Sequence, residues 1–354
     1  MQIEEIAKLS GVSRSTVSRV LNDDPHVKAA TRARVLKIIE SQHYRPNVVA
    51  RRLASGHTHV IGLVMPTAVS ALFSDPYFPW LIQAVASACS ARDYSVMLWL
   101  AEPAQERRTI HQIANNGLLD GVIIAASLLG DPLLQTLADS RLPLMMVGRH
   151  TDPQVSYVDV DNLNSAEEAV AYLLRLGRRR VATITGPRNT IAGADRRTGY
   201  EAALRERGLP VDPALMMEAD FTEMGGYMAA QRLLPQEPDA IFAASDTMAI
   251  GALRALREAG CRVPQDVAVV GFDDLPTAAH ADPPLTTVRQ PIQRTGQVAA
   301  ATLIEMIEER TTQPRRIILP TEFVIRASCG SSLPPSRTEK EVTSSRGIHP
   351  VASA

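Results

Sequence analysis

The sequence has few cysteines and no long apolar segment, and both absences exclude whole classes of protein. Three cysteines, Cys89, Cys261 and Cys329, lie far apart without metal-ligand spacing, so we predict reduced, structural thiols. No apolar run reaches the roughly 18 residues that a membrane-spanning helix needs. Because the N-terminus enters an amphipathic segment directly, without a signal peptide, we expect a cytoplasmic protein with no membrane association.

The familiar catalytic and phosphate-binding motifs are also missing. The chain contains no P-loop, no G-x-S-x-G and no H-E-x-x-H sequence. His57 and His59 are neighbours, but they fall in a linker, which does not favour a metal site. We therefore expect a protein that is not an enzyme and that needs no cofactor.

The charges are distributed unevenly along an otherwise ordinary soluble composition. Of 354 residues, 45% are hydrophobic and 21% charged, which suits one small and one large unit. Residues 1–56 carry ten basic against five acidic residues, or +5, whereas the remainder carries 27 against 33, or −6. A basic head on an acidic body is typical of a DNA-binding sensor, although a charge excess of this size can also simply solvate a surface.

The segment 10–22 has the pattern of a helix-turn-helix. Gly11 can adopt the left-handed conformation of a tight turn, and Ser13 is a good N-cap for a second helix. The apolar face of that helix consists of Val17, Val20 and Leu21. Its other face carries arginines and small hydroxyl residues, which suit base edges and phosphates in the major groove.

We interpret residues 13–21 as a recognition helix, with a surface helical hairpin as the alternative. A third helix is expected over residues 28–43. The candidate DNA contacts in this region are Ser13, Arg14, Ser15, Thr16, Ser18, Arg19 and Asn22.

Two sequence blocks make the interpretation specific. These blocks are I-E-E-I-A-K-L-S-G-V-S-R-S-T-V-S-R-V-L-N, from residue 3, and Y-R-P-N-V-V-A-R-R-L-A-S-G, from residue 44. Together they resemble the LacI/GalR family of bacterial transcriptional regulators, closely over residues 3–56 and more loosely to about residue 328. The resemblance implies a DNA-binding domain over residues 1–46 and a hinge helix over residues 47–56.

The hinge segment is about two turns long, too short to be stable alone in water. In the resembled family it pairs with its copy in a homodimer, enters the minor groove and inserts a leucine that kinks the duplex. The residues matching this role are Asn47, Ala50 and Leu53. The alternative is that Leu53 packs on the surface of the body.

Beyond the hinge, strand-like apolar runs alternate with helical patterns, which predicts parallel sheets. The expected strands are 60–65, 94–100, 122–126, 144–147, 181–185, 215–219, 240–243, 267–272 and 317–319. The expected helices are 78–91, 104–116, 131–139, 164–176, 194–207, 224–234, 247–259 and 292–309. The fold class is thus a small all-α head followed by an α/β core of two similar parallel-sheet lobes.

The resemblance to periplasmic-binding-protein-like cores sets the expected boundaries of this body. The core spans residues 57–330, with lobe 1 over 57–161 and 291–320 and lobe 2 over 162–289 and 321–330. Residues 331–354 are rich in Ser, Pro, Arg and Glu without periodicity, and we expect a disordered tail.

Ligands bind at the carboxyl ends of strands in open parallel sheets, so the residues after each strand are candidates. Aromatic rings, arginine and aspartate at those ends could hold a sugar, although capping and core packing are the alternatives for each residue. The resemblance assigns effector binding to Arg196, Phe221 and Asp273, with Tyr77 and Phe78 on the rim. The strand ends add Ser245 and Arg149; several family members carry an aspartate in place of Arg149.

The combined prediction is a repressor that binds a palindromic operator in double-stranded DNA as a homodimer, controlled by a small carbohydrate effector. A soluble sugar-binding receptor of the periplasmic type is the alternative, which the basic head and absent signal peptide disfavour. The sequence does not distinguish an inducer from a corepressor.

Overall fold

The computed structural model describes residues 3–21, 24–44, 57–65, 75–100, 117–125, 128–130, 136–137, 140 and 142–330. The chain divides into two compact units, Met1–His59 and Val60–Ala354. The expected hinge helix, the tail, the helix at 104–116 and nearly all of the helix at 131–139 lie outside the described residues.

The first unit contains the predicted helix-turn-helix and a third helix. Its helices are α1 (Ile3–Ser10), α2 (Arg14–Leu21) and α3 (Ala29–Ser41). They meet in a small core in which Ile6, Val17 and Val35 are fully buried. Gly11 has a φ of 63° in the turn, a conformation that glycine adopts at little cost. The amide of Val12 donates to the carbonyl of Ala7 at 3.1 Å, which closes the end of α1.

The second unit contains two sheets, and each defines a lobe. The first sheet has the order β11-β5-β4-β3-β1-β2, and all of its pairings are parallel. Its strands are β1 (Val60–Met65), β2 (Ser95–Leu100), β3 (Gly121–Ile124), β4 (Leu144–Val147), β5 (Ser156–Val160) and β11 (Arg316–Leu319). We call this sheet, with α6 (Tyr77–Ser90) and α14 (Ile292–Glu309), the first lobe.

The second sheet has the order β12-β10-β9-β8-β6-β7 and forms the second lobe with its helices. Its strands are β6 (Val181–Thr185), β7 (Met216–Glu218), β8 (Ala240–Ala243), β9 (Ala268–Asp273), β10 (Thr286–Arg289) and β12 (Glu322–Val324). The helices are α9 (Asn162–Arg175), α10 (Ile191–Glu206), α11 (Glu223–Leu233), α12 (Asp246–Glu258) and α13 (Pro276–His280). Short 3-10 turns occur at Pro213–Leu215, Leu234–Gln236 and Ala327–Cys329.

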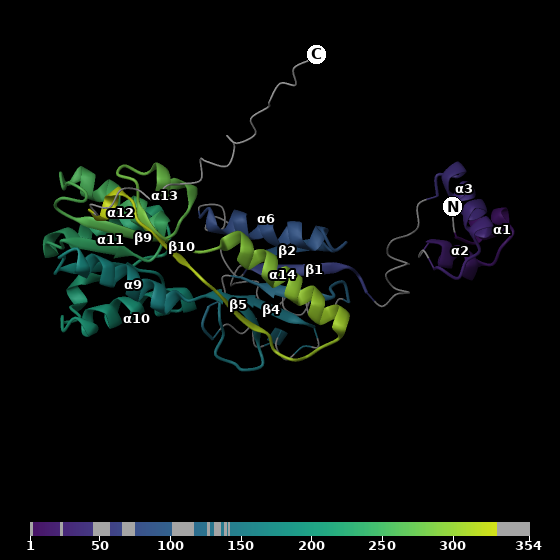
Figure 1. Cartoon of the computed structure of the whole chain (residues 1–354), viewed down its shortest axis with the longest axis horizontal. Coiled ribbons are helices and arrows are strands. Elements are labelled where there is room, and N and C mark those ends of the chain that lie inside the picture. Colours follow the sequence, from purple (N-terminus) through teal and green to yellow (C-terminus); the bar gives the residue numbers. More distant parts are fainter. Residues whose placement is uncertain are drawn as a thin grey trace, which may run out of the picture. The chain divides into compact units, whose positions relative to one another are not determined.

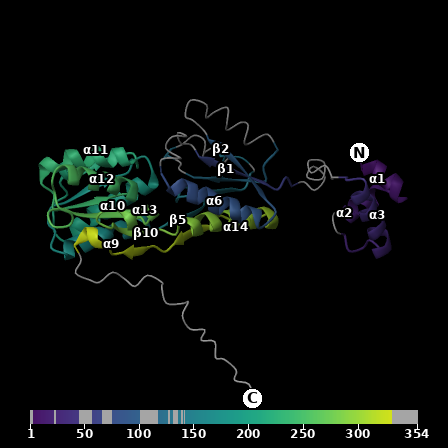
Figure 2. The same cartoon turned by 90° about the horizontal axis from the view of Figure 1, so that it is seen from above.

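Helices cover the sheets in layers (Figures 1 and 2). In the first lobe α14 packs against α6 and against β3, β4 and β5. In the second lobe α9 and α10 cover one face, and α11 and α12 cover the other (Figure 1). Alternate residues of β8 serve these two faces: Phe242 packs with Tyr200 of α10, and Ile241 packs with Leu256 of α12. This arrangement confirms the predicted fold class of two α/β lobes.

The chain passes between the lobes within the described residues after β5, after β10 and after β11. Consequently α14 and β11, although late in the sequence, belong to the first lobe. The carboxyl end of β5 is thereby tied to α9, so polar residues at these crossings can face both lobes.

Periodicity predicted neither β12 and α13, which are only three and five residues long, nor β5 and β10, in which buried polar residues hide the apolar pattern of a strand. Ser156 and Asp159 are buried in β5, and Thr286 and Thr287 are buried in β10. Each has a hydrogen-bond partner; for example, the hydroxyl of Thr287 donates to Asp246 at 2.6 Å. The second sheet is also not wholly parallel, since β12 runs antiparallel to β10. No described helix combines the length and the apolar character that crossing a membrane requires.

Candidate functional site

The first candidate site is the outer face of α2. Ser13 caps this helix, because its hydroxyl accepts from the amide of Thr16 at 3.2 Å. The same hydroxyl lies 2.8 Å from that of Ser15 and 2.9 Å from that of Thr16. The start of the helix therefore presents a small hydroxyl cluster, with Ser13 and Ser15 exposed and Thr16 and Ser18 half-buried.

Two arginines extend from the exposed face of α2, while Val17 and Val20 hold the opposite face in the core. The side chain of Arg14 is 73% exposed, and its Nε lies 3.2 Å from Glu4. That of Arg19 is 66% exposed, and its Nε lies 3.8 Å from Asp24. Exposed pairs of this kind contribute little to stability, so both guanidinium groups can exchange partners readily. The other predicted DNA contacts, Asn22, Asn47, Ala50 and Leu53, lie outside the described residues.

The second candidate site is a buried polar cluster around Arg196, at the carboxyl ends of β5, β8 and β9. The guanidinium of Arg196 donates from Nε to Asn162 at 2.9 Å and from Nη1 to the carbonyl of Ala244 at 2.6 Å. It lies 3.6 Å from the ring centre of Phe272, and Nη1 is 3.5 Å from Asp273. The structure thus brings together Arg196 and Asp273, the two residues on which the predicted effector site rests.

Asp273 is held in this cluster by unusual backbone geometry and by burial. Its φ is 122°, and the side-chain amide of Gln290 donates from Nε2 to its carboxyl group. Burial raises the pKa of Asp273 to about 7, against the opposing effect of Arg196. The carboxyl group therefore changes its charge near neutral pH.

Arg149 extends the cluster across the two lobes. It follows β4 of the first lobe, and its Nε and Nη2 donate to the two oxygens of Asp195, on α10 of the second lobe, at 2.9 and 2.5 Å. Its backbone amide donates to Asp159 at 2.8 Å. Asp159 also accepts from Asn162 at 3.1 Å, and burial raises the pKa of its carboxyl group. A continuous chain of polar contacts therefore runs from Arg149 to Arg196.

The predicted rim aromatics lie in the first turn of α6. Tyr77 and Phe78 are half-buried and form an edge-to-face pair with centroids 5.4 Å apart. Burial raises the pKa of Tyr77, and the nearby carboxylates of Asp159 and Asp273 raise it further. Asp75 caps this turn by accepting from the amide of Tyr77 at 3.1 Å, and burial raises its pKa. This part of the first lobe consequently lies near the charges of the Arg196 cluster.

Phe221 and Ser245 have local structural partners. Phe221 has a φ of 63°, and its ring lies so close to Gly186 that a Cβ on that glycine would be 2.1 Å from the ring. The hydroxyl of Ser245 is buried and accepts from the amide of Met248 at 3.2 Å, which caps α12. Helix capping, weighed as the alternative for the strand-end residues, thus accounts for the contact that Ser245 makes.

Sequence reasoning missed Asn162, Asp159, Asp195 and Gln290 as members of this site. Asn162 and Asp159 could have been found only by recognising β5, whose carboxyl end they flank. Asp195 precedes Arg196 on α10, where nothing in the sequence distinguishes it from a solvent-exposed acid. Among the described residues, no group of His, Cys, Asp and Glu side chains is arranged to hold a metal ion.

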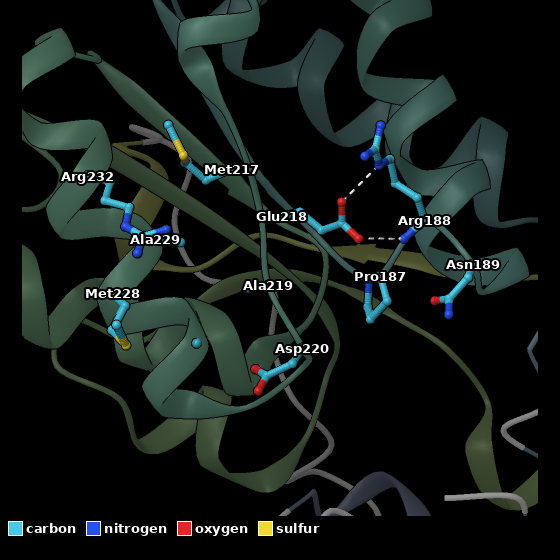
Figure 3. Close-up of a pocket in the computed structure, with 11 residues that line it drawn as sticks. Pro187, Arg188, Asn189, Met217, Glu218, Ala219, Asp220, Met228, Ala229 and Arg232 are labelled. Carbon is cyan, nitrogen blue, oxygen red and sulfur yellow. Dashed lines mark hydrogen bonds and ion pairs between the residues drawn. The ribbon is translucent and has the colours of Figure 1, made fainter. Parts of the chain in front are cut away.

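A surface hollow of about 880 Å³ lies elsewhere in the second lobe, beside its edge strand β7 (Figure 3). Arg188 closes one side, where its amide and Nε donate to Glu218 at 3.1 and 2.8 Å. Met228 and Arg232 of α11 lie on the other side (Figure 3). None of the predicted effector residues lines this hollow, so it is distinct from the Arg196 cluster.

Two family models match the chain. Residues 2–47 match the model described as "Bacterial regulatory proteins, lacI family", and residues 170–329 match a periplasmic binding protein-like domain. The first match covers the helix-turn-helix of the first unit. The second covers most of the second lobe together with α14 and β11.

Full-length relatives cover both units. The chain is 39% identical to the HTH-type transcriptional regulator CelR of Thermobifida fusca over 92% of this chain and 97% of the relative. It is 33% identical to the ribose operon repressor of Escherichia coli over 92% of this chain and 99% of the relative.

Two solved structures are similar over 93% of this chain and 99% of their own. One is a complex of the transcriptional regulator CelR with cellobiose, with 38% identity and a TM-score of 0.74. The other is the lac repressor dimer bound to operator and the anti-inducer ONPF, with 26% identity and a TM-score of 0.82.

Proposed function

The chain belongs to the LacI family of bacterial transcriptional regulators, and we propose that it is a repressor that binds a palindromic operator as a homodimer under the control of a small sugar. One observation carries the proposal: a capped α2 exposes Arg14 and Arg19 while its opposite face is buried. A helix with two exposed guanidinium groups on one face suits the major groove.

In this proposal different residues of α2 contact different parts of the DNA. Arg14 and Ser15 contact base edges at the start of the helix, and Arg19 contacts a base or a phosphate further along. The residues assigned to further base, phosphate and minor-groove contacts are Ser13, Thr16, Ser18, Asn22, Asn47, Ala50 and Leu53. Three of these residues, Asn47, Ala50 and Leu53, belong to the hinge and are included because of the resemblance to the family.

The effector is assigned to the Arg196 cluster. Arg196 offers donors and Asp273 offers acceptors, so the pair suits adjacent hydroxyl groups of a sugar. Tyr77, Phe78 and Phe221 would pack against the apolar faces of sugar rings. Support comes from the CelR relative solved with cellobiose and from the relative named as the ribose operon repressor.

Control of DNA binding requires that the sugar bind one arrangement of the lobes better than another. The Arg149–Asp195 ion pair joins the lobes beside the cluster, so a sugar bound there would meet groups whose positions depend on the arrangement of the lobes. A coupling of about 1–3 kcal/mol would change operator affinity roughly 5- to 150-fold.

The test is selection of bound sequences from a random DNA library with the full chain, followed by titration of the selected duplex with neutral sugars, starting with cellobiose. The proposal expects a symmetric pair of half-sites and an affinity that changes with one sugar. Enrichment of no symmetric site would overturn the operator proposal. Sugar binding without DNA binding would favour the receptor alternative.

A further inference from the structure

The Arg196 cluster contains more carboxyl groups than guanidinium groups. Within the described residues, five carboxyl groups and two guanidinium groups are connected by hydrogen bonds or lie close together. The carboxyl groups belong to Asp75, Asp159, Asp195, Asp246 and Asp273, and the guanidinium groups belong to Arg149 and Arg196. Each guanidinium group already has acceptors inside the protein, so neither is left without a partner for an anionic ligand to supply.

An arginine ordinarily binds an anion through two neighbouring nitrogens of its guanidinium group. In Arg149 these nitrogens already bind a carboxylate of the protein. Its Nε and Nη2 face the two oxygens of Asp195, a two-point geometry that a phosphate or carboxylate ligand would need for itself. Asp195 is 11% exposed in its side chain, so an incoming anion would have to displace a largely buried carboxylate.

The donors of Arg196 are also largely used within the protein. Nε and Nη1 donate to Asn162 and to the carbonyl of Ala244, and Phe272 covers one face of the group. No hydrogen bond among the described residues uses Nη2, which leaves one nitrogen to bind a ligand. A single nitrogen can donate to a hydroxyl oxygen, but it does not reproduce the two-point grip on an oxyanion.

We infer that the effector of this protein is an uncharged polyhydroxylated molecule, and that sugar phosphates and sugar acids are excluded because the Arg149–Asp195 pair and the contacts of Arg196 leave no guanidinium fork free to bind an anionic group. This inference rests on the proposed function. Hydroxyl groups satisfy such a site because they donate to carboxylates and accept from the remaining arginine nitrogen.

The experiment compares each neutral sugar with its own charged derivatives on the full-length protein. Cellobiose, glucose and ribose are paired with cellobionate, glucose 6-phosphate, glucuronate and ribose 5-phosphate, and binding is followed by thermal shift and calorimetry. For any parent sugar that binds, each anionic derivative is expected to bind weaker by roughly tenfold or more.

The outcomes separate the two proposals. An anionic derivative that binds as tightly as its neutral parent, or that binds when no neutral sugar does, would overturn the inference and leave sugar control intact. A panel in which neither class binds would overturn sugar control by these ligands and the inference with it.

A matched pair of variants tests the cause. Asp195→Asn keeps the shape of the side chain, removes one charge and frees the Arg149 fork, so the penalty on anionic derivatives should shrink. Asp266→Asn is the control, because Asp266 makes the same two-point contact with Arg262 at 2.9 and 2.6 Å on an exposed surface that precedes β9. An unchanged penalty in Asp195→Asn, with its fold intact by circular dichroism, would show that the Arg149 fork does not set the selectivity.

Discussion

Arg149 and Asp195 form a two-point ion pair that links the first lobe to the second. Arg149 follows a strand of one sheet, whereas Asp195 lies on a helix that packs against the other. Such a contact depends on the arrangement of the lobes, so it reports on any motion between them. It also places Arg149 beside the cluster to which the effector is assigned.

Removing either partner of this pair should lower stability, and removing both should cost less than the sum. Arg149→Gln leaves Asp195 largely buried without its partner, and Asp195→Asn leaves the guanidinium without its acceptor. A double-mutant cycle by chemical unfolding should give a coupling energy of about 0.5–3 kcal/mol that weakens with added salt. A coupling near zero would mean that the pair does not hold the lobes together.

Arg14→Ala should relax base preference at one position of each half-site and weaken specific binding by about 1–3 kcal/mol. The reason is that Arg14 stands at the exposed start of α2, where a guanidinium can bond a guanine edge. The measurement is a repeat of the sequence selection with the variant. The control is Arg34→Ala, which removes an exposed positive charge from α3 and should leave base preference unchanged. If both variants select the same sequences as the unmodified protein, Arg14 contacts the backbone only.

Arg196→Ala should abolish the response to the sugar and also destabilise the protein. The variant leaves Asp273 buried without its cation, and removing one partner of a buried pair typically costs about 3–5 kcal/mol. Operator affinity without sugar should change little, provided that the variant is assayed well below its unfolding temperature. Titrating operator binding with the sugar checks this, and a normal response would place the effector site elsewhere.

Asp273 should make stability depend on pH below neutrality. Its pKa is about 7 in the folded protein and near 3.8 in the unfolded chain, so the folded state holds a proton that the unfolded state has released. Stability should therefore fall as pH rises from about 4 to about 7 and then level off. Asp75, Asp159 and Asp246, whose pKa values burial also raises, act in the same direction.

Asp273→Asn should flatten part of this slope, as measured by denaturant unfolding at several pH values between about 5 and about 8. The control is Asp266→Asn, because Arg262 lowers the pKa of Asp266 to about 2 and its titration falls below the window. Equal slopes in the unmodified protein and in Asp273→Asn would show that Asp273 is not the group that titrates.

Much of the fold could be predicted because apolar periodicity is strong in the strands that are buried on both faces. The bounds of β1, β4, β6, β8 and α14 agree with the expected ranges to the residue. The pattern failed for β5 and β10, where Ser156, Asp159 and the two threonines replace apolar side chains and find hydrogen-bond partners outside their own strands.

The site was predictable only in part, because the residues that orient its members are distant from them in sequence. Arg196 and Asp273 were identified by resemblance, and the structure brings them together. The residues that orient them act through contacts distant in sequence: Asn162 lies 34 residues from Arg196, and Arg149 lies 46 residues from Asp195. Single-sequence periodicity carries no information about such pairs.

The left-handed backbone after β7 and at the end of β9 has a consequence for protein engineering. Phe221, Asp273 and Asp274 have φ values of 63°, 122° and 57°, a region that side chains with a Cβ adopt at a cost of about 1–3 kcal/mol. Glycine would relieve that cost at Phe221, whereas at Asp273 or Asp274 it would also remove the ion-pair partner of Arg196 or of Arg289 and Arg326. A library screened for heat resistance alone should therefore accumulate glycine at position 221. The selected variants would be more heat-resistant but would respond less to the sugar, because the ring removed is a proposed ligand contact. Screens on this scaffold should therefore score the response and the melting temperature together.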